Sequence, residues 1–127
     1  MHILVCSRMS IPAKDRTLPA WEYLRSQGHR ITVEHPDSVP TTEKPDAIIG
    51  MGVTVMEECF IALSRFPGVP AYLYNWDIYK WVWETPREGE YDYVRYGKLL
   101  SLAKEIWVPS ECTGRRTTQW YGLKNWH

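Results

Sequence analysis

The chain has 127 residues, with 15 Lys or Arg and 15 Asp or Glu, so its formal net charge is zero. This length suits one domain with a real hydrophobic core, and the balanced charge argues against nucleic acid or an anionic membrane as a partner. Three widely spaced cysteines, Cys6, Cys59 and Cys112, fit neither a disulfide framework nor a zinc site, so we expect no metal and buried thiols in a reducing compartment such as the cytoplasm.

The first predicted elements are a strand and a helix. Ile3–Cys6 is a continuous apolar run, typical of a parallel strand covered on both faces and too short for a secretory signal. Thr17 can cap the following helix, whose Trp21 and Leu24 share one face. Gly28 marks the end of that helix.

Two further strands and the clearest helix follow. Ile31–Val33 and Ala47–Ile49 predict strands, and the turn Gly50-Met51-Gly52 closes the second of them. Thr54–Glu57 has the pattern of a capping box. The helix that it would begin continues at regular apolar spacing until Pro67-Gly68.

The second half of the chain repeats the alternation. Ala71–Tyr74 predicts a strand, Asp92–Lys104 a helix, and Ile106–Val108 another strand. Ser110 can cap a final helix that Gly122 closes. No apolar run reaches membrane-spanning length, so we expect no transmembrane segment.

Strands and helices that alternate with short connections indicate an α/β fold. We predict a single domain of about five βα units with a Rossmann-like, doubly wound parallel sheet. In such sheets ligands bind outside the carboxyl ends of the strands. This rule predicts that four segments share one rim: 7–16, 50–54, 75–83 and 110–113.

An aromatic segment, Tyr72–Trp83, holds three of the seven tryptophans and three of the eight tyrosines of the chain. Aromatic faces stack on sugar C–H groups, and Asp77 could act as a general base or accept hydrogen bonds from hydroxyls. Asn75, Trp76 and Tyr79 are the further candidates for contact with an acceptor. Some of these rings could instead fill the core or meet a partner.

The basic residues Arg8, Lys14 and Arg16 follow the first predicted strand. They could meet a phosphate or carboxylate, or they could belong to a solvated loop. The segment lacks the glycines of a dinucleotide-binding turn, so a nicotinamide or flavin site is not expected.

Two other rim segments have a structural and a ligand-binding interpretation. Gly50, Met51 and Gly52 could present free N–H groups to a ligand, or the glycines could serve close packing alone. Ser110 and Glu111 could contact a ligand, although capping by Ser110 is the simpler interpretation.

The order of these segments resembles the N-terminal half of glycosyltransferases of the GT-B fold, especially the family 4 type. The resemblance covers essentially the whole chain and rests on MHILVCSR, SQGHRITV, PDAIIGMG, AYLYNWD and RYGKLLSLAKEIWVPSECTGRRTTQWYGL. Two positions depart from the family pattern. Ser10-Ile11-Pro12 replaces a Gly-Gly turn, and Trp76-Asp77 replaces a His-Asp pair, so a catalytic role carries over to Asp77 only in part.

The resemblance implies a metal-independent enzyme that moves a sugar from a nucleotide-sugar donor to a glycan or another hydroxyl acceptor. Asp77 would orient the acceptor hydroxyl. The donor binds chiefly to the C-terminal half in this family, and the sequence ends about where the linker to that half would begin. The chain is then an acceptor-side half that needs a C-terminal domain or partner chain, is inactive alone, and could self-associate through an uncovered patch.

Two other functions remain open at this point. The chain could be a non-catalytic Rossmann-like module that binds a glycan or a protein through its aromatic rim. A phosphoacceptor domain of flavodoxin-like strand order is disfavoured, because no acidic cluster follows the first strand and no Asp ends the third.

Overall fold

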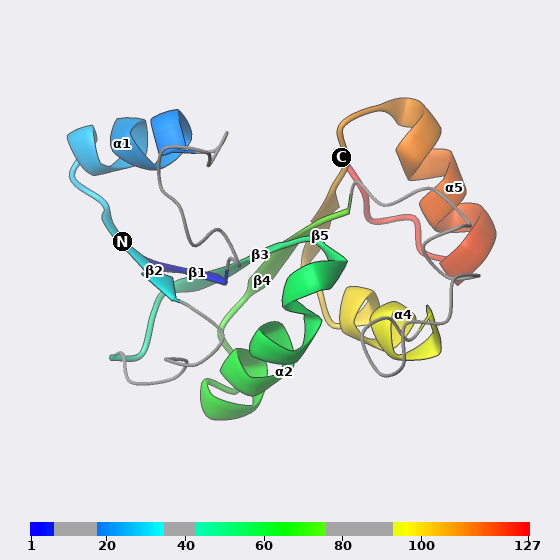
Figure 1. The fold of residues 1–127 in the computed structure, drawn as a ribbon, viewed down its shortest axis with the longest axis horizontal. Helices are drawn as coiled ribbons and strands as arrows, with labels where there is room; N and C mark the ends of the chain where they lie inside the picture. The colour runs from blue at the N-terminus through cyan, green and yellow to red at the C-terminus, as the bar shows by residue number, and fades with distance from the viewer. Residues whose placement is uncertain (7–17, 35–42, 76–92) are drawn as a thin grey trace.

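The computed structural model describes residues 1–6, 18–34, 43–75 and 93–127. Its strands are β1 (His2–Cys6), β2 (Arg30–Glu34), β3 (Ala47–Met51), β4 (Ala71–Tyr74) and β5 (Glu105–Trp107). Its helices are α1 (Leu18–Ser26), α2 (Met56–Arg65), α4 (Tyr93–Ser101) and α5 (Glu111–Tyr121), with a short 3-10 helix, η2 (Val53–Val55), before α2. The predicted α/β, Rossmann-like fold is confirmed (Figure 1).

All five strands run parallel, in the order β2-β1-β3-β4-β5. The last residue of β1, Cys6, pairs with Glu34 on one side and with Gly50 on the other. The chain leaves β1 toward β2 and later returns to β3 on the opposite side of β1, which makes the gap between β1 and β3 a topological switch point. The carboxyl ends of the strands therefore lie along one edge of the sheet.

Strand β1 is buried on both faces, as its apolar run predicted. Leu4 and Cys6 belong to a core formed with α2 and α4, whereas Ile3 and Val5 belong to a second core. The second core is completed by Trp21 of α1. Helices thus cover both faces of the sheet, with α1 on one side and α2 and α4 on the other (Figure 1).

The start of α2 differs from the prediction. The capping box expected at Thr54–Glu57 is wrong, because α2 begins at Met56 with Val55 at the N-cap position and no side-chain cap. The chain first makes one turn of 3-10 helix that buries Val53 and Val55 in the core. Hydrophobic burial of these two valines takes precedence over the local capping pattern.

The ends of α5 agree with the prediction. The Ser110 hydroxyl accepts a hydrogen bond from the Thr113 N–H at 3.2 Å, and Gly122 takes a left-handed conformation with φ of 71°. The other helical ends differ slightly, since α4 stops at Ser101 and not at Lys104. Thr17 and Asp92, the predicted starts of the first and third helices, lie outside the described residues.

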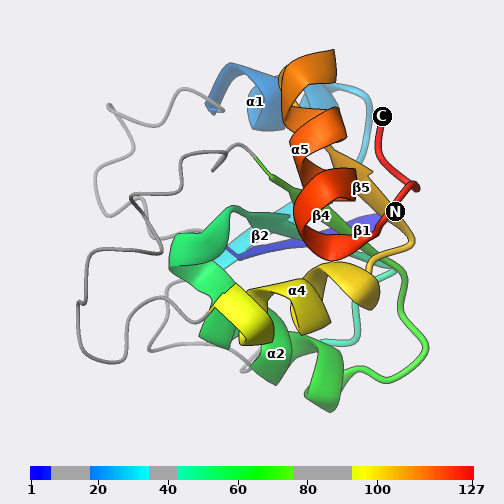
Figure 2. The same cartoon turned by 90° about the vertical axis from the view of Figure 1, so that its right-hand side faces the viewer.

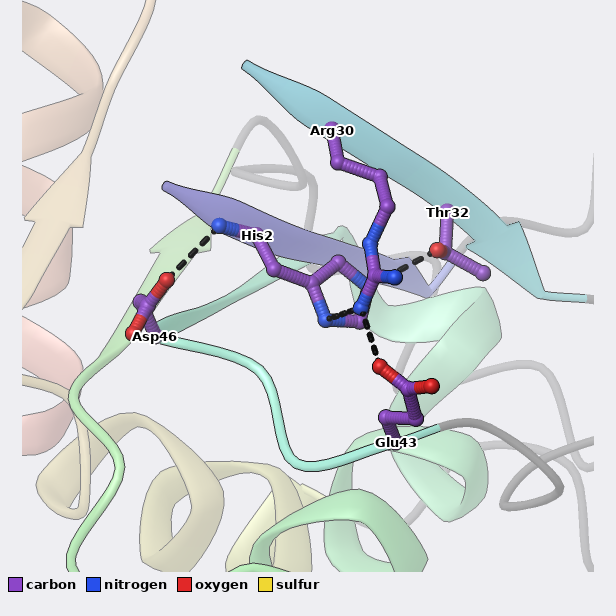
Figure 3. A network of polar contacts seen from close by, with 5 residues as sticks. All are labelled: His2, Arg30, Thr32, Glu43 and Asp46. Atoms are coloured by element: carbon purple, nitrogen blue, oxygen red, sulfur yellow. Dashed lines mark hydrogen bonds and ion pairs between the residues drawn. The ribbon is translucent and has the colours of Figure 1, made fainter.

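A polar network ties the amino end of the sheet together (Figure 3). Nη2 of Arg30 donates to Nδ1 of His2 at 2.9 Å, so the protonated nitrogen of this ring is Nε2, which donates to Thr32 Oγ1 at 2.8 Å. The His2 N–H donates to Asp46 Oδ2 at 2.7 Å. A hydrogen bond from Arg30 and its positive charge lower the pKa of Glu43. The network joins β1 and β2 to the segment before β3, at the edge opposite the predicted site.

The segment 125–127 extends the sheet beyond β5. Ile106 donates its N–H to the Asn125 carbonyl at 3.0 Å and accepts from the His127 N–H at 2.9 Å. Between them, the Trp126 ring packs against Gly114 of α5 and donates to Thr118 Oγ1 at 2.9 Å. A Cβ at position 114 would collide with this ring.

We predict that Gly114→Ala destabilises the chain by about 1–3 kcal/mol, because overpacking outweighs the better helix propensity of alanine. Urea unfolding of the wild type and the variant measures the difference. In a Trp126→Ala background the same substitution should become neutral or stabilising. An equal cost in both backgrounds would contradict the packing explanation.

Candidate functional site

The candidate site is the edge of the sheet at which the strands end. Met51, Tyr74 and Trp107 are the last residues of β3, β4 and β5. Of the predicted site residues, the structure places Gly50, Met51, Gly52, Asn75, Ser110 and Glu111 at or next to this edge. The remaining predictions fall outside the described residues: Arg8, Lys14, Arg16, Trp76, Asp77 and Tyr79.

Asn75 is the polar centre of this edge. It directly follows β4, and its backbone N–H donates to the Trp107 carbonyl at 2.8 Å. Its side chain is 2% exposed: Nδ2 donates to Thr117 Oγ1 at 2.9 Å, and Oδ1 accepts from the Tyr96 hydroxyl at 3.2 Å. Thr117 in turn donates to the Thr113 carbonyl at 2.9 Å. One amide therefore connects the end of β4 with β5, α4 and α5.

This geometry gives the Asn75 side chain a positioning role. A buried amide with both ends hydrogen-bonded holds one orientation, because leaving any of these groups unpaired would be costly. The contact with an acceptor that we predicted for Asn75 has no support in this arrangement, since almost none of its side chain is exposed.

The glycines after the predicted third strand have separate roles. Gly50 lies inside β3, and a Cβ there would stand 2.6 Å from both Cys59 Sγ and Leu73 Cδ2. Gly52 has a φ of 91° and leads into η2. The predicted turn Gly50-Met51-Gly52 is corrected accordingly, because its first two residues belong to the strand. Close packing accounts for the glycine at position 50.

Ser110 and Glu111 both have partners within α5. Besides its cap bond, the Ser110 hydroxyl lies 3.1 Å from Thr113 Oγ1. Glu111 forms an ion pair of 2.6 Å with Arg115, and both side chains are largely exposed, so the pair contributes little to stability. The capping interpretation of Ser110 is confirmed, and ligand contact by Glu111 stays a prediction.

The cysteines differ in their surroundings. Cys6 and Cys59 are fully buried. A hydrogen bond with the Cys6 thiol, together with burial, raises the pKa of the Cys59 thiol well above its usual range. Such thiols are chemically inert. The prediction that all three cysteines are buried is wrong for Cys112, which lies exposed on α5.

A largely apolar groove lies on the α1 face of the sheet, next to the carboxyl edge. Its volume is about 350 Å³. The residues that line it come from α1, β3, β4 and β5: Ala20, Trp21, Tyr23, Leu24, Ile49, Met51, Tyr74 and Trp107. We name this cavity the α1 groove.

Sequence reasoning missed the partners of Asn75 and most of the α1 groove. Neither Tyr96 nor Thr117 is among the site residues that the sequence predicts. Glu58 was also missed, although its carboxyl is buried beside Cys59 and its Oε2 has no hydrogen-bond partner among the described residues. For Tyr96 and Thr117, the available signal in the sequence was Asn75, because an amide directly after a buried strand needs buried hydrogen-bond partners.

Within the described ranges, no cluster of three or more His, Cys, Asp and Glu side chains could hold a metal ion. Across the same residues, no helix combines the length and the apolar character needed to cross a membrane. No protein-family model matches the chain, and no curated protein or solved structure matches it significantly.

We predict that Asn75→Ala destabilises the chain by about 2–4 kcal/mol, because Thr117 and Tyr96 each lose a buried partner. Chemical unfolding followed by tryptophan fluorescence measures the change. Asn125→Ala is the matched control: this exposed amide donates to the Ala103 and Lys104 carbonyls, so its loss should cost under about 1 kcal/mol. Equal losses of stability in the two variants would argue against a structural role for the buried hydrogen bonds of Asn75.

A second prediction concerns the thiols. In the folded chain, a thiol reagent at neutral pH should label Cys112 rapidly and leave Cys6 and Cys59 unmodified until the chain is unfolded in urea. Mass spectrometry after timed labelling counts the modified sites. The Cys112→Ser variant should show almost no labelling in the folded state. Rapid modification of Cys59 in that variant would contradict the buried arrangement.

Proposed function

We propose that the chain is the acceptor-binding half of a nucleotide-sugar-dependent glycosyltransferase. The support is the correspondence between the resemblance and the fold. The five segments that resemble the family 4 type fall, in the same order, on β1, on the end of α1 and β2, on β3, on β4 and on the stretch from α4 through α5. The resulting parallel sheet has a carboxyl edge of the kind at which α/β proteins bind ligands.

The observation that carries the proposal is the anchoring of Asn75. Its amide is hydrogen-bonded to α4 and α5, and its N–H is bonded to the end of β5. Asn75, the residue before Trp76-Asp77 in the sequence, is therefore a fixed point at the rim. Catalytic groups need support of this kind, because small errors in position reduce the rate strongly.

In the proposed reaction Asp77 orients the acceptor hydroxyl and accepts its proton. The acceptor oxygen forms a bond to the sugar while the bond between the sugar and the phosphate of the donor breaks, and the nucleotide leaves with the electron pair of that bond. The nucleotide-sugar donor is a substrate held by a C-terminal domain or a partner chain. Closure of that second half over the rim would exclude water from the reacting sugar. The acceptor is a glycan or another hydroxyl compound, and the reaction needs no metal or resident cofactor.

We further propose that the reaction takes place in the cytoplasm. The three cysteines are all free. Cys6 and Cys59 are buried, and their thiols are hydrogen-bonded to each other and form no disulfide. Free thiols are usual in reducing compartments.

The test combines the chain with a donor-binding half, supplied either on a longer gene product or as a separate chain. Sugar transfer to a panel of hydroxyl acceptors is measured with labelled nucleotide sugars. We expect transfer by the combined protein, none by the isolated chain, and a decrease in kcat of about 100-fold or more for Asp77→Asn. Glu22→Gln, on the exposed surface of α1, should keep full activity.

Two outcomes would contradict the proposal. Undiminished transfer by Asp77→Asn would remove Asp77 from the chemistry while leaving the enzyme class intact. A combined protein that transfers no sugar from any common nucleotide donor would exclude the enzyme class. In that case the second candidate, a non-catalytic binding module, is favoured by the α1 groove, because residues of this chain alone form it.

A further inference from the structure

The two outer edges of the sheet differ. Beyond β5, the segment 125–127 hydrogen-bonds to Ile106, so the chain covers this edge itself. Strand β2 lies at the other end of the strand order and pairs only with β1 among the described strands. Within the part of the chain that the structure describes, this outer edge is therefore open, and an open edge is a template for pairing with another strand.

The backbone of β2 shows which polar groups form this edge. Arg30 donates its N–H to the Met1 carbonyl at 2.9 Å, so the backbone polar groups of Arg30 point toward β1. Because successive residues of a strand alternate, the N–H and C=O groups of Ile31 and Val33 point away from the sheet. The only hydrogen bond to these groups among the described residues is a long one, from the Arg25 side chain to the Ile31 carbonyl at 3.4 Å. We name these outward groups of Ile31 and Val33 the β2 edge.

The sequence of β2, RITVE, is complementary to itself when two copies run antiparallel. With a two-fold axis at Thr32, Ile31 of each copy stands opposite Val33 of the other. Each such pair can exchange both of its N–H···O=C bonds, because these are the residues whose polar groups point outward. In the same register, Arg30 stands opposite position 34, a glutamate. Cross-strand pairs of opposite charge, of two threonines and of two β-branched apolar residues are all favourable.

The side chains at this edge are compatible with the pairing. Val33 is 41% exposed, and the pairing would bring Ile31 of the other copy beside it. Both hydrogen bonds of the Arg30 guanidinium to described residues use Nη2, so Nη1 and Nε can donate to a second carboxylate. The Arg25 side chain is 39% exposed and its bond to the edge is long and weak, so it can move aside.

We propose that the β2 edge binds a second copy of this chain and forms a two-fold symmetric dimer in which the two sheets join into one. The contact is short, so the dissociation constant is on the order of 100 µM. The C-terminus lies at the opposite end of the sheet (Figure 1), so the segment 125–127 takes no part in the contact. The carboxyl edges of the two sheets point in opposite directions, and the dimer does not depend on sugar transfer.

Solvent exchange of the backbone amides, followed by NMR, tests the register. We expect the Ile31 and Val33 amides to exchange about threefold more slowly at about 1 mM chain than at about 50 µM, in proportion to the smaller fraction of monomer. The Thr32 amide points toward β1, so its exchange should not depend on concentration in this way. Sedimentation over the same range measures the dissociation constant.

A pair of charge reversals tests the partner. Arg30→Glu and Glu34→Arg should each weaken self-association by at least about tenfold, because each places like charges opposite each other. When the two variants are mixed, they should associate with each other, since every charge at these positions then faces its opposite. Glu111→Arg is the matched control, because it makes the same change of charge on the exposed surface of α5. It should dimerise as the wild type does.

A further variant separates a lost contact from a lost fold. Arg30 also hydrogen-bonds to His2, so circular dichroism is used to check that Arg30→Glu is folded. Val33→Lys changes an exposed position outside that network and should abolish the dimer on its own. A wild type that stays monomeric at about 1 mM would overturn the proposal and leave the β2 edge to a strand of a different protein. A dimer that withstands both Glu34→Arg and Val33→Lys would overturn it as well, because another surface would then join the two copies.

Discussion

A parallel strand without a polar face has to be covered from both sides, and β1 is such a strand. The need to bury both of its faces determines where the helices pack. Leu4 and Cys6 require the layer formed by α2 and α4, while Ile3 and Val5 require α1. With its neighbours β2 and β3 paired on either side, β1 fixes where the strands end. The carboxyl edge, and with it the candidate site residues that the structure describes, takes its position from this burial (Figure 2).

The placement of α5 explains why the two faces of the sheet differ. Its buried side chains include Thr113 and Thr117, which are polar, and Gly114. Thr117 hydrogen-bonds to the buried amide of Asn75, and Gly114 receives the Trp126 ring. Helix α5 therefore packs at the β5 end of the core that contains α4. The aromatic face around Tyr72 and Trp107 has α1 beside it, and the α1 groove results.

Local sequence patterns predicted the helices and strands well, because each pattern depends on only a few consecutive residues. The apolar run of β1 and the cap and glycine of α5 are signals of this kind. The capping box at Thr54 failed because burial of Val53 and Val55, a tertiary effect, decided the start of α2. The hydrogen bonds of the Asn75 side chain could not be predicted from residue spacing, since its partners Tyr96 and Thr117 lie 21 and 42 positions away in the sequence. Likewise, residues from four elements line the α1 groove, and no single segment of the sequence could predict that these elements come together.

The end of β4 links the two features. Successive residues of a strand point to opposite faces, so Tyr74 faces the α1 groove while Asn75 points into the core beside α4 and α5. Asn75 is held by hydrogen bonds from three directions, and this keeps Tyr74 in place as part of the groove floor. Loss of the Asn75 amide would therefore loosen the rim and the groove together, although the two lie on opposite faces of the sheet.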